Sequence, residues 1–357
     1  MVRFDAARQL LERAIAERVS PGAIVEVGTD RDILWRFAAG TLSYDAGSPP
    51  VRDDTVYDLA SLTKVLSTAS LLMREIERGS IALDESVPHL LPGCRNPALV
   101  GATVEDLLAH CAGFPAYRPF YKTLEGEDAF EAGICATPLE YVPRTQSIYS
   151  DLGFMLLGIV LGRGVALEQR FDAMWTQIAS GEDLQFLPPA QWRARTAPTE
   201  DEPWRGRLLV GEVHDQNAAA LGGVAGHAGL FGTAPAVGAF ARHLFQVLDG
   251  RTGVFAESSL RRFITRRSDI PGSSRALGWD TMLPTSSCGT RMSAQAFGHT
   301  GFTGTSLWLD PATGVYVVLL TNRVHPTRDN DAIQRLRPAL HDAVMGDVRL
   351  PGIANRL

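Results

Sequence analysis

The chain has 357 residues, which is enough for one large domain or for two interleaved subdomains. Hydrophobic residues make up 45% of it and charged residues 21%, the balance of an ordinary globular protein with a sizeable core. The net charge of −6 at pH 7 disfavours a general attraction to nucleic acid or to anionic lipid. We therefore expect neither a nucleic-acid partner nor a membrane partner.

The N-terminal residues lack the basic start and the apolar stretch of about 7–15 residues that a secretory signal needs. The sequence therefore predicts a cytoplasmic location, although a chain trimmed of its leader would look the same. The four cysteines include no Cys-x-x-Cys pair, so we expect neither a zinc site nor a redox dithiol. Without an export signal, reduced thiols are expected. No metal and no cofactor are predicted.

The spacing of apolar residues and the position of turn residues predict helices in some segments and strands in others. In chain order they are an amphipathic helix at residues 4–15, strands at 22–28 and 33–39, helices at 65–76, 104–110 and 154–161, an irregular connection at 187–207, a glycine-rich segment at 222–232, strands at 305–309 and 315–321, and a final helix at about 331–344.

Strands at both chain ends, with helices between them, indicate one sheet that is built from both ends and carries a helical insertion. The predicted fold class is therefore α+β, a largely antiparallel sheet flanked by helices, rather than alternating β-α-β units. We expect residues 1–64 and 270–357 to form the sheet domain and residues 65–269 a mainly helical domain. An active site is expected in the cleft between them.

The sharpest local motif is Ser61-Leu62-Thr63-Lys64, where an irregular segment becomes a helix. Residues three apart share a helix face, so Lys64 can reach Ser61. A serine hydroxyl is a weak nucleophile until a neighbouring base takes its proton, and a lysine with a lowered pKa can do this. The unpaired amides of the first helical turn would supply donors for an oxyanion.

The motif alone is only suggestive. With two lysines in the chain, a Ser-x-x-Lys arises by chance about once in ten such sequences. A helix-capping serine followed by a surface lysine would give the same letters. However, the remaining basic residues are all arginine, which cannot act as a base. A lysine at position 64 therefore fits the need for a proton acceptor.

Two further motifs lie far from the first in the chain. Tyr149-Ser150-Asp151 stands just before an apolar helix, and His299-Thr300-Gly301 stands at the edge of the C-terminal strand pair. Each is unremarkable in isolation, since Tyr149 could be a core tyrosine and Asp151 a helix cap. Together with Ser61 and Lys64, in this order, they are far more specific.

This combination resembles the serine β-lactamase superfamily, in particular the branch that holds class C β-lactamases, D,D-carboxypeptidases, D-aminopeptidases and family VIII carboxylesterases. The resemblance extends over about residues 21–344 and includes two further sequence segments, Leu107–Pro115 and Gly226–Ala234. It implies a largely antiparallel sheet flanked by helices plus a helical domain, in agreement with the fold class expected from the elements.

The resemblance also implies roles for individual residues. Ser61 would be the nucleophile, Lys64 its proton partner, and Tyr149 a second base or a shuttle toward the leaving group. The backbone N–H groups of Ser61 and Phe302 would hold the oxyanion. The implied substrate-binding residues are Asp151, His299, Thr300 and Gly301.

Two departures from the commonest pattern change the expected activity. Asp151 stands where many members have Asn, and its charge would tend to keep Lys64 protonated. His299 stands where β-lactamases usually have Lys, and a histidine is mostly neutral at pH 7. A β-lactamase is therefore less favoured than a peptidase, amidase or esterase.

The sequence thus predicts a serine hydrolase that acts on a small-molecule ester, amide or peptide through an acyl-enzyme. The candidate activities are carboxylesterase, and peptidase or amidase on D-amino-acid or cell-wall peptides. The alternatives are a β-lactamase and a non-catalytic protein that binds peptidoglycan fragments. There is no Gly-x-Ser-x-Gly elbow. His214 is expected to be a loop histidine with a structural partner, whereas His227 could either face the cleft or be structural. The oligomeric state is left open.

Overall fold

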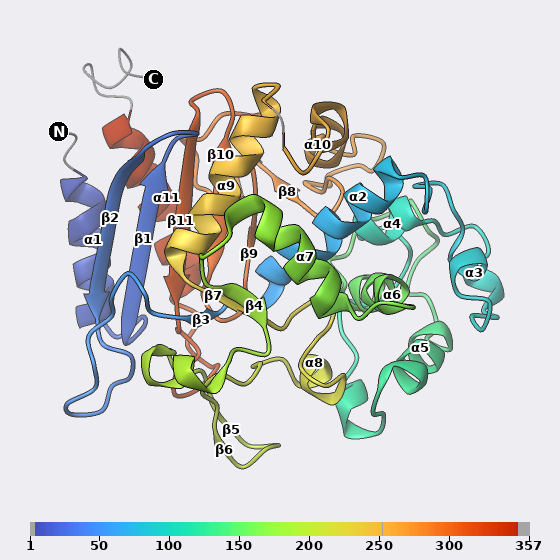
Figure 1. Ribbon diagram of the computed structural model, residues 1–357, viewed down its shortest axis with the longest axis horizontal. Coiled ribbons are helices and arrows are strands. Elements are labelled where there is room, and N and C mark those ends of the chain that lie inside the picture. Colours follow the sequence, from blue (N-terminus) through green and yellow to red (C-terminus); the bar gives the residue numbers. More distant parts are fainter. Residues whose placement is uncertain (1–3, 252, 349–357) are drawn as a thin grey trace.

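The computed structural model describes residues 4–251 and 253–348, and its centre is a six-stranded antiparallel sheet (Figure 1). The strand order is β2-β1-β11-β10-β9-β8, so both ends of the described chain contribute to one sheet. Its strands are β1 (Gly22–Gly28), β2 (Ile33–Gly40), β8 (Asp280–Thr281), β9 (Phe297–Thr300), β10 (Ser306–Asp310) and β11 (Val315–Thr321). This arrangement confirms the predicted α+β class.

Side chains alternate along the central strands and so point to both faces of the sheet. Both faces are buried, because each packs against helices. In β1, Val25 and Val27 face the helices α1 (Asp5–Ala16) and α11 (Ile333–Val348), together with Trp308 of β10. Ile24 faces the opposite side, where it joins the larger core. β1 pairs with β11 from Ala23↔Thr321 to Gly28↔Tyr316, a register that brings the two chain ends together.

Helix α9 (Ala234–Leu248) covers the other face of the sheet and packs on β1 and β11 (Figure 1). The remaining helices lie beyond it, away from α1 and α11. They are α2 (Ser70–Glu77), α3 (Val87–Leu90), α4 (Val104–Leu108), α5 (Glu127–Cys135), α6 (Asp151–Gly162), α7 (Leu167–Ala179), α8 (Gln216–Ala220) and α10 (Glu257–Ile264). The division into a sheet domain and a helical domain stays a prediction. Helix α9 falls within the predicted helical domain by sequence, but it packs against the sheet.

Two minor sheets connect the helical part to the active-site region. A three-stranded sheet has the order β3-β7-β4, and a hairpin pairs β5 with β6. Their bounds are β3 (Tyr57–Asp58), β4 (Leu184–Phe186), β5 (Asp201–Glu202), β6 (Arg207–Leu208) and β7 (Leu230–Gly232). The segment predicted to be an irregular connection, residues 187–207, therefore contains a short helical turn at Ala190–Arg195 and most of this hairpin.

The expectation of reduced thiols is wrong for two of the four cysteines. Cys94 and Cys135 form a disulfide, whereas Cys111 and Cys288 are free and buried. The pairing leaves no local signal in the sequence, because 41 residues separate the partners. A disulfide persists in oxidising compartments, so this crosslink weighs against the cytoplasmic location, which stays a prediction.

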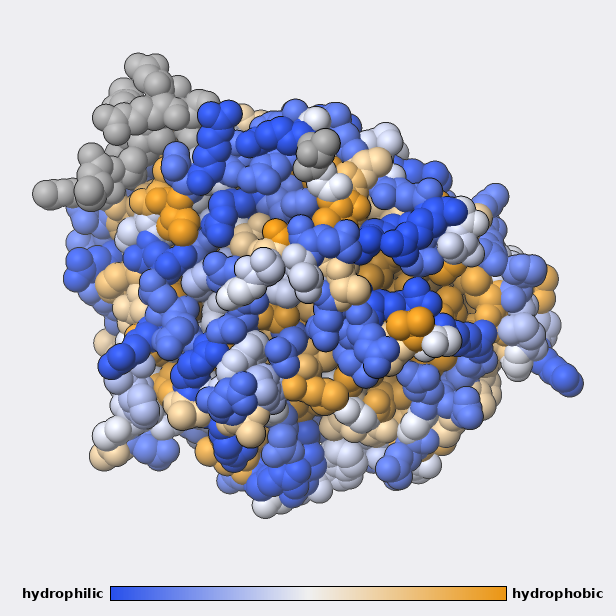
Figure 2. All heavy atoms as spheres, viewed as in Figure 1, coloured by the Kyte–Doolittle hydropathy of each residue, from blue (hydrophilic) through white to orange (hydrophobic). Residues whose placement is uncertain are grey.

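Within the described residues, no helix is long and apolar enough to cross a membrane. On the face shown in Figure 2, hydrophilic residues cover most of the surface and hydrophobic residues form scattered patches.

Candidate active site

The segment that carries Ser61 leaves β3 through a strained residue. Ala60 has φ of +49°, a left-handed conformation that is costly for a residue with a Cβ. The buried carboxylate of Asp58 stabilises it by accepting the Ala60 N–H at 2.8 Å. Residues Ala60–Leu62 then form a tight helical turn, and Lys64–Ala69 continue as a π-helical turn that leads into α2. Ser61 is thus placed at the start of a helix, as predicted, but on a tighter turn.

Lys64 lies directly beside Ser61 and is completely buried. Its Nζ donates to Ser61 Oγ at 2.9 Å, to Asp151 Oδ1 at 2.8 Å and to the His227 carbonyl at 3.2 Å. An ammonium group has three N–H donors, and each of them has an acceptor here. The geometry is therefore that of a charged lysine that holds the serine hydroxyl in place.

Electrostatics agree with this geometry. Burial lowers the pKa of Lys64, but Asp151 and Tyr149 beside it together outweigh burial and raise that pKa above its ordinary value. A lysine that acts as a base needs a lowered pKa. Lys64 is therefore a proton donor toward Ser61 in this state, as the charge of Asp151 led us to expect.

Tyr149 is held beside Lys64 by the N-terminus of α6. Ser150 caps that helix by accepting the Leu152 N–H at 3.2 Å, and its hydroxyl donates to the Pro115 carbonyl at 2.7 Å. The centre of the Tyr149 ring lies 4.9 Å from Lys64 Nζ and 5.0 Å from the guanidinium carbon of Arg275. The Tyr149 ring therefore lies close to two cations on the cleft wall.

The His299-Thr300-Gly301 triplet lies at the end of β9, opposite Ser61. The His299 ring is 2% exposed, and its Nδ1 lies 2.8 Å from the Thr300 carbonyl oxygen. Burial, together with the positive charge of Lys64, lowers the pKa of His299 well below 6.5. It is therefore neutral at pH 7, and a neutral ring cannot replace a lysine as an anion anchor.

Gly301 brings this triplet into close contact with the segment of the nucleophile. A Cβ at position 301 would lie 2.0 Å from Thr305 Oγ1 and 2.6 Å from the Leu59 carbonyl oxygen. Thr305 Oγ1 also donates to Leu59 O at 3.0 Å. Only glycine fits at this contact, so the loop after β9 is fixed against residues 59–61.

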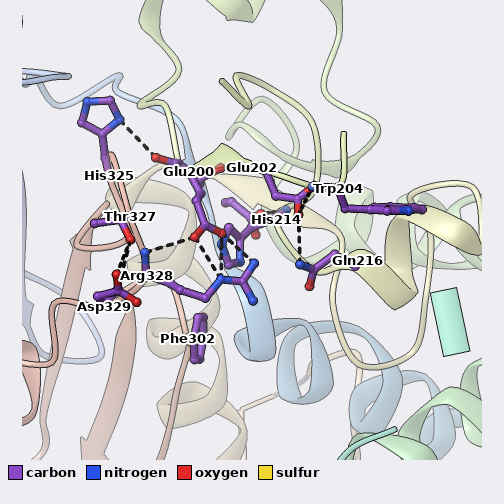
Figure 3. A network of polar contacts seen from close by, with 12 residues as sticks. Glu200, Glu202, Trp204, His214, Gln216, Phe302, His325, Thr327, Arg328 and Asp329 are labelled. Carbon is purple, nitrogen blue, oxygen red and sulfur yellow. Dashed lines mark hydrogen bonds and ion pairs between the residues drawn. The ribbon is translucent and has the colours of Figure 1, made fainter. Parts of the chain in front are cut away.

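Phe302, the other predicted oxyanion donor, has a half-exposed side chain supported by a polar network (Figure 3). Its ring stacks on His214 with centroids 5.6 Å apart. His214 Nε2 lies 2.9 Å from Glu200 Oε2, and the same carboxylate accepts hydrogen bonds from Arg328 through Nε and Nη2. Although burial opposes it, the hydrogen bonds from His214 and Arg328 lower the pKa of Glu200 to about 2.

Asp58 connects this network to the nucleophile. Its Oδ2 accepts the His214 N–H at 2.6 Å, and its backbone carbonyl accepts Thr303 Oγ1 at 2.8 Å. The other carboxylate oxygen, Oδ1, accepts a hydrogen bond from the Ala60 N–H. One buried residue therefore links Ala60 and His214 through its side chain, and the loop after β9 through its backbone carbonyl.

His227 and Asp215 form a further pair on the cleft wall. His227 Nε2 lies 2.9 Å from Asp215 Oδ1, and the same oxygen caps α8 by accepting the Ala218 N–H at 2.7 Å. Burial opposes ionisation of Asp215, but His227 and the other partners of the carboxylate lower its pKa. His214 and His227 thus each have a carboxylate partner, and both also line the cleft.

The residues from all three motifs line one cleft with a volume of about 580 Å³. Ser61, Tyr149, Asp151, His299, Thr300 and Gly301 are all on its wall, while Lys64 lies directly beneath. The sequence missed Asp58, Glu200, Arg275, Arg328 and Arg337, since single charged residues that are scattered over the chain form no local pattern. Within the described residues there is no cluster of potential metal ligands.

Comparison with known proteins agrees with this geometry. The family model described as Beta-lactamase matches residues 7–341. The chain belongs to the Beta-lactamase family. It is 31% identical to a protein of Escherichia coli strain K12 named "Putative D-alanyl-D-alanine carboxypeptidase", over 88% of this chain and 82% of that protein. The resemblance predicted from the three motifs is confirmed.

A second relative and a solved structure are also similar to this chain. The N-acetylmuramyl-L-alanine amidase of Bacillus subtilis strain 168 is 30% identical, over 89% of this chain and 80% of its own. EstCE1, a hydrolase with promiscuous acyltransferase activity, shares the fold with a TM-score of 0.76 at 19% identity, over 96% of this chain and 98% of its own. The chain is therefore a serine hydrolase of the Beta-lactamase family.

Proposed function

We propose that this hydrolase cleaves small amides or esters through an acyl-enzyme on Ser61, with amides of cell-wall peptides as its first candidate substrates. The observation that carries the proposal is the contact of 2.9 Å between Lys64 Nζ and Ser61 Oγ in a cleft that also holds Tyr149. The printed names of the relatives, a carboxypeptidase and an amidase, support an amide substrate.

The proton of Ser61 needs an acceptor other than a charged Lys64. We assign this role to the deprotonated form of Tyr149, whose ring centre lies 4.9 Å from Lys64 Nζ. Ser61 Oγ would attack the carbonyl carbon while its proton passes to the Tyr149 oxygen. Tyr149 would then protonate the leaving amine or alkoxide, and water would hydrolyse the acyl-enzyme by the reverse route. The Ser61 and Phe302 N–H groups would stabilise each oxyanion.

A β-lactam substrate carries a carboxylate, and the buried neutral His299 gives it no fixed positive charge. Arg275, Arg323, Arg328 and Arg337 line the same cleft, so the β-lactamase alternative is kept and is tested by nitrocefin in the panel below. Esterase activity is the second candidate, since the same nucleophile and oxyanion donors cleave simple esters.

A substrate panel tests the proposal. p-Nitrophenyl butyrate, nitrocefin, a D-Ala-D-Ala peptide and an N-acetylmuramyl-L-alanine amide are given to the wild type and to Ser61→Ala. We expect hydrolysis of an amide or ester by the wild type and none by the variant. Hydrolysis that survives Ser61→Ala would contradict the assigned nucleophile. Binding of a peptidoglycan fragment without cleavage of any substrate would favour the non-catalytic alternative.

A further inference from the structure

The peptide group between Gly301 and Phe302 has a charged partner on its far side. Arg337 of α11 donates from Nη2 to the Gly301 carbonyl oxygen at 2.6 Å and to the Thr305 carbonyl oxygen at 3.0 Å. That carbonyl belongs to the same peptide unit as the Phe302 N–H, the expected oxyanion donor. In a trans peptide the C=O and N–H point in opposite directions, so the guanidinium lies behind the donor.

Arg337 is unusual because its charge is buried without compensation. Its side chain belongs to a residue that is 8% exposed, and within the described residues it forms no ion pair. Its Nε is buried with no hydrogen-bond partner. Burial and the nearby Arg323 lower the pKa of Arg337 to about 10, so the group remains charged at pH 7. A buried unpaired cation is destabilising, so a role for it is worth seeking.

The loop that carries Phe302 is closed on itself. Gly301 N–H donates to Thr305 O at 2.7 Å, and Gly304 N–H donates to Gly301 O at 3.1 Å. The Gly301 carbonyl therefore accepts two hydrogen bonds, one of them from a cation. By contrast, the Phe302 N–H has no acceptor in the part of the chain that the structure describes. This N–H is therefore free to donate, and its peptide group is polarised by the two hydrogen bonds that the Gly301 carbonyl accepts.

From this arrangement we infer that Arg337 is a positioning residue of the oxyanion hole, which orients and polarises the Gly301–Phe302 peptide from behind. A hydrogen bond to a carbonyl from a charged donor strengthens the donor power of the N–H in the same peptide unit. From behind the peptide, the buried cation also adds positive potential at the place where the oxyanion forms. This inference rests on the function proposed above, since it concerns the same oxyanion.

The test compares Arg337→Met and Arg337→Lys with Arg335→Met, an exposed arginine of the same helix. With p-nitrophenyl butyrate we expect Arg337→Met to lower kcat about tenfold or more at a nearly unchanged KM, somewhat less than the loss of a direct oxyanion donor. Arg337→Lys, which keeps the charge, should recover part of that loss, and Arg335→Met should match the wild type.

Two measurements separate this role from a structural one. The first is inhibition by phenylboronic acid, which forms a tetrahedral adduct with an active-site serine, and its Ki should rise in parallel with the loss of kcat. The second is the melting temperature, which should not fall, since an unpaired buried charge is removed. An unchanged kcat, or a loss of kcat with unchanged boronate affinity, would overturn the inference. If Arg337→Met fails to fold, the same comparison is made with Arg337→Lys alone.

The two proposals can fail separately. An active wild type whose kcat is indifferent to Arg337 contradicts only the inference. A wild type that is not acylated on Ser61 by any substrate contradicts the proposed function itself.

Discussion

The chemistry of individual residues here depends on which charges stay paired inside the protein. Lys64 and Asp151 are in contact at 2.8 Å directly below the nucleophile, and the carboxylate contributes to raising the pKa of the amine. Glu200 similarly determines how His214 and Arg328 are held under Phe302. Each carboxylate therefore offers a test with a defined dependence on pH.

Replacing Asp151 with asparagine should shift the pH profile of activity toward acid. Asp151 is one of two neighbours that raise the pKa of Lys64 against burial, so its removal lowers that pKa. Lys64 would then lose its proton at lower pH, and the acid limb of kcat/KM should move down by about one pH unit or more. Asp280→Asn, a carboxylate on the same cleft wall, is the control. An unshifted or raised acid limb would contradict the assigned electrostatics.

Replacing Glu200 with glutamine should destabilise the fold at neutral pH only. The pKa of Glu200 is about 2 in the folded protein against an ordinary 4.5, so its contribution to stability is complete above pH 4.5 and is lost as the pH falls toward 2. We expect the free energy of unfolding to drop by about 2 kcal/mol at pH 7, less than for a fully buried pair because Arg328 is partly exposed.

Denaturant unfolding at several pH values measures this difference. The exposed neighbour Asp201, replaced by asparagine, serves as the control. A difference between wild type and Glu200→Gln that stays constant down to pH 2 would count against the pairing.

At the scale of elements, the site is made where β3, β9 and the start of α6 converge. Four strands of the main sheet, β1, β2, β10 and β11, were predicted from their apolar residues and the turn residues beside them, whereas the short strands β8 and β9 were not. The contact of the loop after β9 with residues 59–61 was not predictable from local pattern. It depends on Gly301, Thr303 and Thr305, which lie more than 240 residues from the carbonyls of Asp58 and Leu59.

Gly301→Ala should disrupt that contact. Its Cβ would lie 2.6 Å from the Leu59 carbonyl oxygen, so the loop after β9 has to move away from Ser61. We expect kcat/KM to fall at least about 100-fold, as for the loss of an oxyanion donor, and the melting temperature to fall modestly. Gly101→Ala, whose Cβ would meet open space, should leave both unchanged. Full activity in Gly301→Ala would show that the loop and the nucleophile are not tightly coupled.

The proximity of Ser61, Lys64, Tyr149 and His299 could be expected from the resemblance of three motifs, although not from any one of them. The partners behind them could not. Asp58, His214 and Glu200 act through hydrogen bonds between segments that are far apart in the chain. Such contacts follow from the packed fold and leave no periodic signal in the sequence.

At the scale of the molecule, the disulfide lies in the helical part and closes a long segment that contains α4. Joining Cys94 to Cys135, 41 residues apart, limits the freedom of the unfolded chain. We expect the double variant Cys94→Ser, Cys135→Ser to lose about 4 kcal/mol of stability, from the entropy of a loop of this length. Its activity per folded molecule should be unchanged, since neither cysteine lines the cleft.

Melting curves with and without a reducing agent test this expectation. The wild type should melt at a lower temperature when reduced, whereas the double variant should not respond. A wild type that is indifferent to reduction would indicate that the crosslink does not form.

The central claim, that residue 61 carries a covalent acyl or acyl-like group during the reaction, has one direct measurement. The intact protein is treated with a fluorophosphonate, and its mass and the modified peptide are determined. We expect one added phosphonyl group on Ser61 of the wild type and none on Ser61→Ala. A wild type that remains unmodified, or a label on any other residue, would contradict it.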